Sequence, residues 1–187
     1  NMSRRIEAEE LTLVTAVQNI IQRYQENEEQ YELYDHYQPG SMRVVPPGTD
    51  LTQFHAPRGD EWQAHVGQVI RRFLDEPNKP MILALSRPDP RKNIGALVKA
   101  FGESPRLKDL ANLVIIAGTR DDISDMDEGA QEVLTDLLLA IDRFDLYGKV
   151  AYPKWHRGGD VPKIYRIAAL SGGVFVNPAL TEPFGLT

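Results

Sequence analysis

Apolar residues in the C-terminal half of the chain fall into two alternating patterns. Short, nearly continuous apolar runs predict buried strands, and longer amphipathic stretches between them predict helices. The predicted strands are Met81–Leu85, Asn112–Ala117, Val150–Tyr152 and Gly173–Val176. The predicted helices are Ile94–Phe101, Glu128–Phe144 and Val161–Ala169. This alternation is typical of an α/β protein with right-handed crossovers, so we expect a Rossmann-like parallel sheet with flanking helices.

The first 80 residues carry a less regular pattern. Apolar residues at helical spacing predict three helices, and two short runs predict strands. The predicted helices are Ile6–Val17, Glu26–Tyr34 and Asp60–Asp75, and the predicted strands lie within Gln18–Gln22 and Met42–Val45. Pro39-Gly40 is typical of a loop or of a domain boundary.

Polar residues concentrate in the loops that follow the predicted strands. Ligands of open parallel sheets bind at the carboxyl ends of the strands. The loops expected there are Ser86–Asn93, Gly118–Asp127, Pro153–Asp160 and Asn177–Gly185. Three of the four contain clustered polar side chains that packing does not require, which indicates a binding site at this edge.

The first of these loops is basic and contains Arg87, Arg91 and Lys92. Arg87 could bind a phosphate with its forked guanidinium, Lys92 could add a point charge, and the following helix N-terminus would add its dipole. A solvated loop with three exposed cations explains the same residues, so the motif alone leaves both interpretations open.

The last loop carries a single carboxylate, Glu182, followed by Phe184, Gly185 and Leu186 where a helix should begin. Glu182 could bind sugar hydroxyl groups beside the unpaired backbone N–H groups of that helix start. A carboxylate that caps the helix is the simpler interpretation of the residue taken alone.

The third loop contains Trp155 and His156 between Tyr152 and Arg157. A nucleobase could stack on this aromatic group, although exposed loop aromatics explain it equally well. His156 has no serine or cysteine nucleophile pattern near it. No histidine spacing supports a metal site, and the glycine motifs of phosphate-binding and dinucleotide-binding loops are absent.

Composition restricts the class of protein further. The 187 residues contain 42% hydrophobic and 26% charged residues, as ordinary globular proteins do. The net charge of −6 disfavours general nucleic-acid binding. No apolar run reaches the length of a membrane span, so we expect no membrane partner. The absence of cysteine is compatible with a cytoplasmic protein.

The ordered set of loop motifs resembles the sucrose-phosphate synthases, one branch of the sucrose-synthesising glycosyltransferases. The resemblance covers most of the chain. It rests on Arg4-Arg-Ile-Glu-Ala-Glu-Glu10, Val45-Pro-Pro-Gly-Thr-Asp50, Ser86-Arg-Pro-Asp-Pro-Arg-Lys-Asn93, Asn112-Leu-Val-Ile-Ile-Ala-Gly-Thr-Arg-Asp-Asp122, Asp160-Val-Pro-Lys-Ile-Tyr165 and Asn177-Pro-Ala-Leu-Thr-Glu-Pro-Phe-Gly-Leu-Thr187. Sucrose synthase shares many of these features, but the Pro-Asp-Pro, Arg-Asp-Asp and Asp-Val-Pro-x-Ile-Tyr motifs favour the phosphate-synthase branch.

The resemblance implies a retaining glycosyltransferase of GT-B architecture that moves glucose from UDP-glucose to fructose 6-phosphate without a required cofactor. It also implies site residues. Arg87 and Lys92 would hold the diphosphate, Glu182 the glucose hydroxyls, and the N–H groups of Phe184, Gly185 and Leu186 the same sugar. Trp155, His156 and Val161 would border the uracil, and Arg4 and Arg5 would lie near the acceptor phosphate. No metal site is implied.

The resemblance also implies a truncated arrangement. Residues 1–40 would be the tail of an N-terminal acceptor domain and the hinge, and residues 41–187 part of the C-terminal nucleotide-sugar-binding domain. The segment between Tyr37 and Met42 is shorter than the family pattern. We expect this chain alone to be inactive and to self-associate through surfaces exposed by truncation. The alternatives are sucrose synthase, another UDP-glucose-dependent glycosyltransferase, or a non-catalytic Rossmann-like module.

Overall fold

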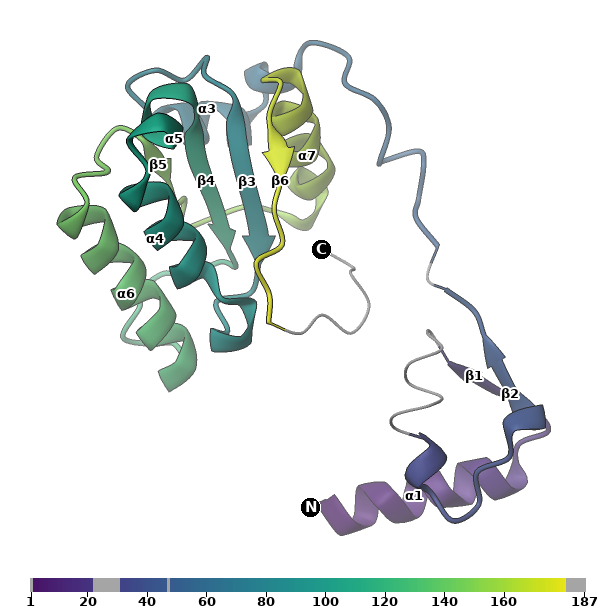
Figure 1. Cartoon of the computed structure of the whole chain (residues 1–187). Coiled ribbons are helices and arrows are strands. Elements are labelled where there is room, and N and C mark those ends of the chain that lie inside the picture. The colour runs from purple at the N-terminus through teal and green to yellow at the C-terminus, as the bar shows by residue number, and fades with distance from the viewer. Residues whose placement is uncertain (1, 22–30, 47, 181–187) are drawn as a thin grey trace. The chain divides into compact units, whose positions relative to one another are not determined.

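The structure, a computed structural model, describes residues 2–21, 31–46 and 48–180. Two compact units divide the chain between Thr49 and Asp50. The first unit contains helix α1 (Met2–Thr15), strand β1 (Asn19–Ile21) and strand β2 (Met42–Val44). The second unit contains a parallel sheet and the helices that cover it, as Figure 1 shows.

The first unit is built around a small apolar cluster. Strands β1 and β2 pair in parallel, with Asn19 opposite Met42. Leu13 of α1 packs with Ile21 and Met42 of the two strands. The predicted helix Glu26–Tyr34 falls mostly outside the described residues, and its described end is a single 3-10 turn, Tyr31–Leu33.

The sheet of the second unit is parallel and has the strand order β5-β4-β3-β6. Its strands are β3 (Met81–Ser86), β4 (Asn112–Ala117), β5 (Val150–Ala151) and β6 (Val174–Phe175). Met81 pairs with Asn112, Leu113 with Val150, and Ile82 with Val174. The order corresponds to 3-2-1-4 along the chain, which is that of a Rossmann half. The predicted α/β class and parallel sheet are therefore confirmed.

Helices cover both faces of this sheet (Figure 1). They are α3 (His65–Arg71), α4 (Ile94–Glu103), α5 (Pro105–Leu110), α6 (Glu128–Arg143) and α7 (Val161–Leu170). One face packs against α3 and α7 through residues such as Ile70 and Ile164. The other packs against α4 and α6 through residues such as Val98 and Leu137. Strand β4 is buried along its whole length, because it has strands on both sides and helices on both faces.

Two predictions were wrong and one helix was not predicted. The predicted helix Asp60–Asp75 is a 3-10 turn (Glu61–Gln63) followed by the seven-residue α3, because Ala64 between them is extended. The last strand is exposed rather than buried, since β6 lies at the described edge of the sheet and Val174 is 56% exposed. The missed helix α5 begins after Ser104, whose side chain accepts a hydrogen bond from Leu107 N.

Candidate functional site

The strand order reverses between β3 and β6. From β3 the chain adds β4 and then β5 on one side of the sheet, and it then returns to add β6 on the other side of β3. Ligands of such sheets bind in the crevice at this switch point, outside the carboxyl ends of the strands. The loops that border it follow β3 and β6, and they are the basic loop and the turn that begins at Asn177.

Two hydrogen bonds join these loops. Asn93 Nδ2 donates to the carbonyl oxygen of Pro178 at 3.1 Å. The backbone N–H of Leu180 donates to the carbonyl oxygen of Arg91 at 2.9 Å. Asn93 has a φ of 54°, in the left-handed region that asparagine tolerates better than most residues. The basic loop and the start of the last loop are therefore held side by side.

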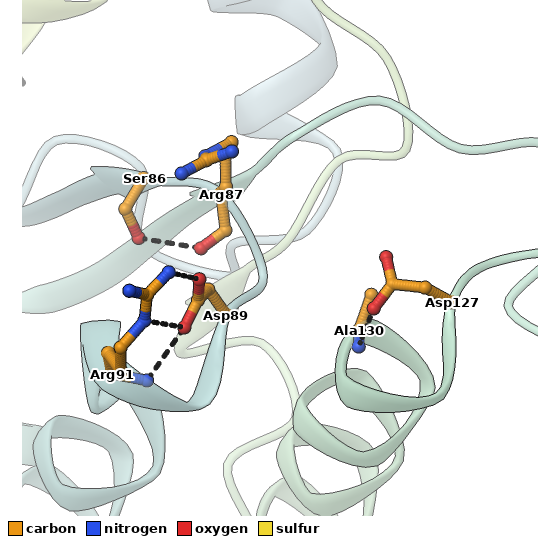
Figure 2. Close-up of polar contacts among 6 residues, drawn as sticks. All are labelled: Ser86, Arg87, Asp89, Arg91, Asp127 and Ala130. Carbon is orange, nitrogen blue, oxygen red and sulfur yellow. Dashed lines mark hydrogen bonds and ion pairs between the residues drawn. The ribbon is translucent and has the colours of Figure 1, made fainter. Parts of the chain in front are cut away.

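The structure separates the roles of two arginines in the basic loop (Figure 2). Arg91 donates from Nε and Nη2 to the two carboxylate oxygens of Asp89, at 3.1 and 2.7 Å. These bonds, with one from the Arg91 backbone N–H, lower the pKa of Asp89 to about 2. Arg91 is thus engaged in ordering the turn, and it is a poorer candidate for a ligand.

Arg87 has the opposite character. Its side chain is exposed and points away from the Asp89–Arg91 pair in Figure 2. Within the described chain no acceptor binds its guanidinium group. Arg87 lines a cavity of about 270 Å³ together with Asp127, whose carboxylate accepts a hydrogen bond from Ala130 N at the start of α6. Lys92 lies in the same 3-10 turn as Arg91 and is half-buried.

The loop after β5 forms a second cavity, of about 520 Å³, with the first residues of α3. Trp155 and His156 both line it, together with the cations Arg157 and Lys163. His156 Nδ1 is buried and has no hydrogen-bond partner in the structure. Val161, the third residue predicted here, begins α7 and does not line this cavity.

The side chains of the remaining predicted residues lie outside the part of the chain that the structure describes. Glu182, Phe184, Gly185 and Leu186 lie outside the described residues. Arg4 and Arg5 fall within α1 of the first unit, and their side chains also lie outside the description. No group of three or more metal-ligating side chains occurs among the residues that the structure describes. None of the described helices is long and apolar enough to span a membrane.

Sequence analysis missed two polar residues at this edge of the sheet. Asn93 joins the two loops of the switch point, and its position directly before α4 was the signal. Arg120, in the loop after β4, is buried and bonds to the loop after β5. Its place at the carboxyl end of a buried strand was informative, but an arginine in a loop is usually exposed.

Curated relatives match almost the whole chain. A probable sucrose-phosphate synthase from Craterostigma plantagineum is 46% identical over 222 aligned positions, which cover 98% of this chain and 20% of the relative. One from Arabidopsis thaliana is 46% identical and covers 100% of this chain and 21% of the relative. The sucrose-phosphate synthase of Zea mays is 46% identical over 98% of this chain and 21% of its own length. No protein-family model matches.

A solved structure agrees with the sequence relatives. The sucrose-phosphate synthase from Thermosynechococcus elongatus superimposes with a TM-score of 0.69 at 23% identity, covering 98% of this chain and 40% of that one. At that identity the likeness shows the fold. The chain spans about a fifth of the length of the curated relatives that it matches. Over nearly its whole length, this chain is a homologue of the sucrose-phosphate synthases.

Proposed function

We propose that this chain provides the donor-nucleotide side of a glycosyltransferase that moves glucose from UDP-glucose to fructose 6-phosphate. The observation that carries the proposal is the position of the basic loop. It borders the switch point of a Rossmann-type sheet, and it presents an exposed Arg87 that no described acceptor binds. The names of the relatives, sucrose-phosphate synthases, supply the reaction.

In the proposed mechanism, Arg87 and Lys92 bind the diphosphate of the donor. Negative charge grows on this group as the glycosidic bond breaks, and fixed cations that stabilise it lower the barrier without a metal ion. The guanidinium of Arg87 can donate two parallel hydrogen bonds, whereas Lys92 acts as a point charge. The Asp89–Arg91 pair keeps the turn between them ordered.

The base and the sugar would bind on either side of the diphosphate. Trp155 and His156 line a cavity large enough for a pyrimidine ring. Val161 would support this loop from the start of α7. Glu182 would hold glucose hydroxyls, beside the backbone N–H groups of Phe184, Gly185 and Leu186.

The two parts of the chain would belong to different domains of the enzyme. Residues 1–40 would belong to the end of an acceptor domain and the hinge, with Arg4 and Arg5 near the phosphate of fructose 6-phosphate. Residues 41–187 would belong to the donor domain. The chain spans about a fifth of the length of its relatives, and we expect it to bind the donor nucleotide.

A titration of UDP into the chain by calorimetry tests the proposal. We expect saturable binding, and we expect the double variant Arg87→Ala/Lys92→Ala to weaken it by at least about a hundredfold, since each hydrogen bond to a charged group contributes about 1.5–3 kcal/mol. The matched control is Arg106→Ala/Lys108→Ala, which removes the same charges from α5, before the amino end of β4.

The control variant should bind UDP like the unmodified chain. Equal weakening by both double variants would mean that the affinity reflects only the net charge of the protein. Absence of UDP binding at millimolar concentration in a folded, unmodified chain would contradict the proposed function and would favour a non-catalytic Rossmann-like module.

A further inference from the structure

Arg120 connects two of the loops at the carboxyl edge of the sheet. Its backbone N–H donates to the carbonyl oxygen of Lys154 at 3.0 Å. Its guanidinium donates from Nη2 to the carbonyl oxygen of Tyr152 at 3.3 Å and from Nη1 to that of Pro153 at 3.4 Å. Lys154 Nζ bonds in return to the carbonyl oxygen of Asp121 at 2.9 Å. Three consecutive carbonyl groups of one loop therefore converge on a single residue of the other.

This arginine is an expensive choice for a purely structural connection. Arg120 is only 7% exposed, and no carboxylate of the described chain pairs with it. Its Nε is buried without an acceptor. Burial lowers the pKa of its guanidinium, which is the sign that the charged form is poorly solvated there. Burying a charge that has no counter-ion costs free energy, so a neutral donor would stabilise the fold better.

The forked shape of the Arg120 side chain explains why an arginine is used here despite the free-energy cost of burying its charge. A guanidinium holds its N–H groups in a fixed plane, so two bonds from it fix the direction of the chain segment that accepts them. The accepting residues, 152–154, lie directly before Trp155 and His156, which line the 520 Å³ cavity. The Trp155 side chain itself is 59% exposed. Arg120 therefore holds the backbone of this loop in place immediately before the residues that line the cavity.

We propose that Arg120 is a positioning residue for nucleobase recognition. By holding the carbonyl groups of residues 152–154, it presents Trp155 and His156 to the base of a nucleoside diphosphate. This inference rests on the proposed function, because the base is that of the donor nucleotide. It differs from a role in diphosphate binding, which belongs to the basic loop after β3.

A comparison of two ligands separates positioning from general stability. UDP contains both the base and the diphosphate, whereas inorganic pyrophosphate contains only the phosphates. We expect Arg120→Met to weaken UDP binding about tenfold, the loss of a well-oriented base contact, and to leave pyrophosphate binding unchanged. Arg120→Lys, which keeps the charge but not the fork, should recover part of the UDP affinity. The control Arg143→Met removes an exposed arginine at the end of α6 and should change neither affinity.

The tryptophans provide a readout that needs no ligand. Trp62 and Trp155 are the only two in the sequence, so Trp62→Phe leaves one reporter on the loop. In that background, Arg120→Met should increase the rotational freedom of Trp155, measured by fluorescence anisotropy decay, at temperatures where the chain remains folded.

Each outcome decides between the alternatives. Unchanged UDP affinity in Arg120→Met would overturn the inference, and so would an equal loss for UDP and pyrophosphate, which indicates a damaged fold. If the unmodified chain binds neither ligand, the proposed function fails and base positioning fails with it. The Trp155 readout then decides separately whether Arg120 orders the loop.

Discussion

Replacing Glu61 by alanine is expected to reduce the free energy of unfolding of the second unit by about 3–5 kcal/mol, the range measured when one partner of a buried ion pair is removed. Glu61 is 4% exposed, and its Oε1 accepts a hydrogen bond from Arg166 Nε at 3.0 Å. The carboxylate also accepts hydrogen bonds from the backbone N–H groups of Arg58 and Gly59, at 2.9 and 3.0 Å. The variant would leave the half-buried Arg166 without its counter-ion.

The pH dependence of stability follows from the same contacts. Burial alone would raise the pKa of Glu61, but the hydrogen bonds from the two backbone N–H groups and the charge of Arg166 outweigh burial and lower it. Because the pKa of Glu61 is lower in the folded state, the ionised carboxylate stabilises the fold at pH values above 4.5, the ordinary pKa of a glutamate. This contribution should disappear as the pH falls below 4.5, and Glu61→Gln should lose that part of the pH dependence.

A double-mutant cycle provides the control. Urea unfolding of Glu61→Ala, Arg166→Ala and the double variant measures the coupling between the two side chains. We expect the double variant to be more stable than the sum of the single losses predicts, because it leaves no unpaired charge. Additive losses would contradict the assignment of a coupled ion pair. Arg166 Nη1 also bonds to Gln53 O at 2.6 Å, so Arg166→Ala should additionally loosen the segment before Glu61.

The variant Gly173→Ala should be about as harmful, with an expected loss of about 3 kcal/mol. Gly173 lies directly before β6, and a methyl group there would overlap the backbone of Met81 at the start of β3, approaching its nitrogen to 2.6 Å. Backbone atoms cannot rotate away as a side chain can. The strand β6 would have to move off β3, to which it is joined by only two residue pairs.

Gly95→Ala is the matched control for this clash. Gly95 lies within α4, and a methyl group there would meet no atom within 4 Å. Alanine has the higher helix propensity, so this variant should gain up to about 1 kcal/mol. Thermal unfolding of both variants checks the pair. A Gly173→Ala protein as stable as the unmodified chain would show that β6 does not approach β3 as closely as described.

The sequence predicted the central strands well because their signal is local. Asn112–Ala117 is apolar at nearly every position, and it forms β4 with the predicted bounds. The same reasoning failed for β6, because an apolar run gives no information about which strand lies at the sheet edge. It also failed for Asp60–Asp75, where Glu61 is held by an arginine 105 positions away and by N–H groups just before it.

The candidate site likewise contains features that the local sequence predicts and features that depend on long-range contacts. The basic loop could be found from charge and from its place after a strand, and the structure adds that Arg91 is engaged with Asp89 while Arg87 is not. The importance of Arg120 and Asn93 depends on carbonyl groups of other loops, at Tyr152 and Pro178. No pattern within a single segment can indicate such long-range bonds, so only the folded arrangement shows them.

The most direct test of the donor-site assignment is a map of amide chemical-shift changes in ¹⁵N-labelled chain on addition of UDP. The account predicts that the changes concentrate in residues 86–93 and 152–161, at the carboxyl edge of the sheet, and that pyrophosphate reproduces only those in the first range. Changes concentrated at the amino edge, such as in Pro105–Leu110, or within the first 49 residues would contradict it.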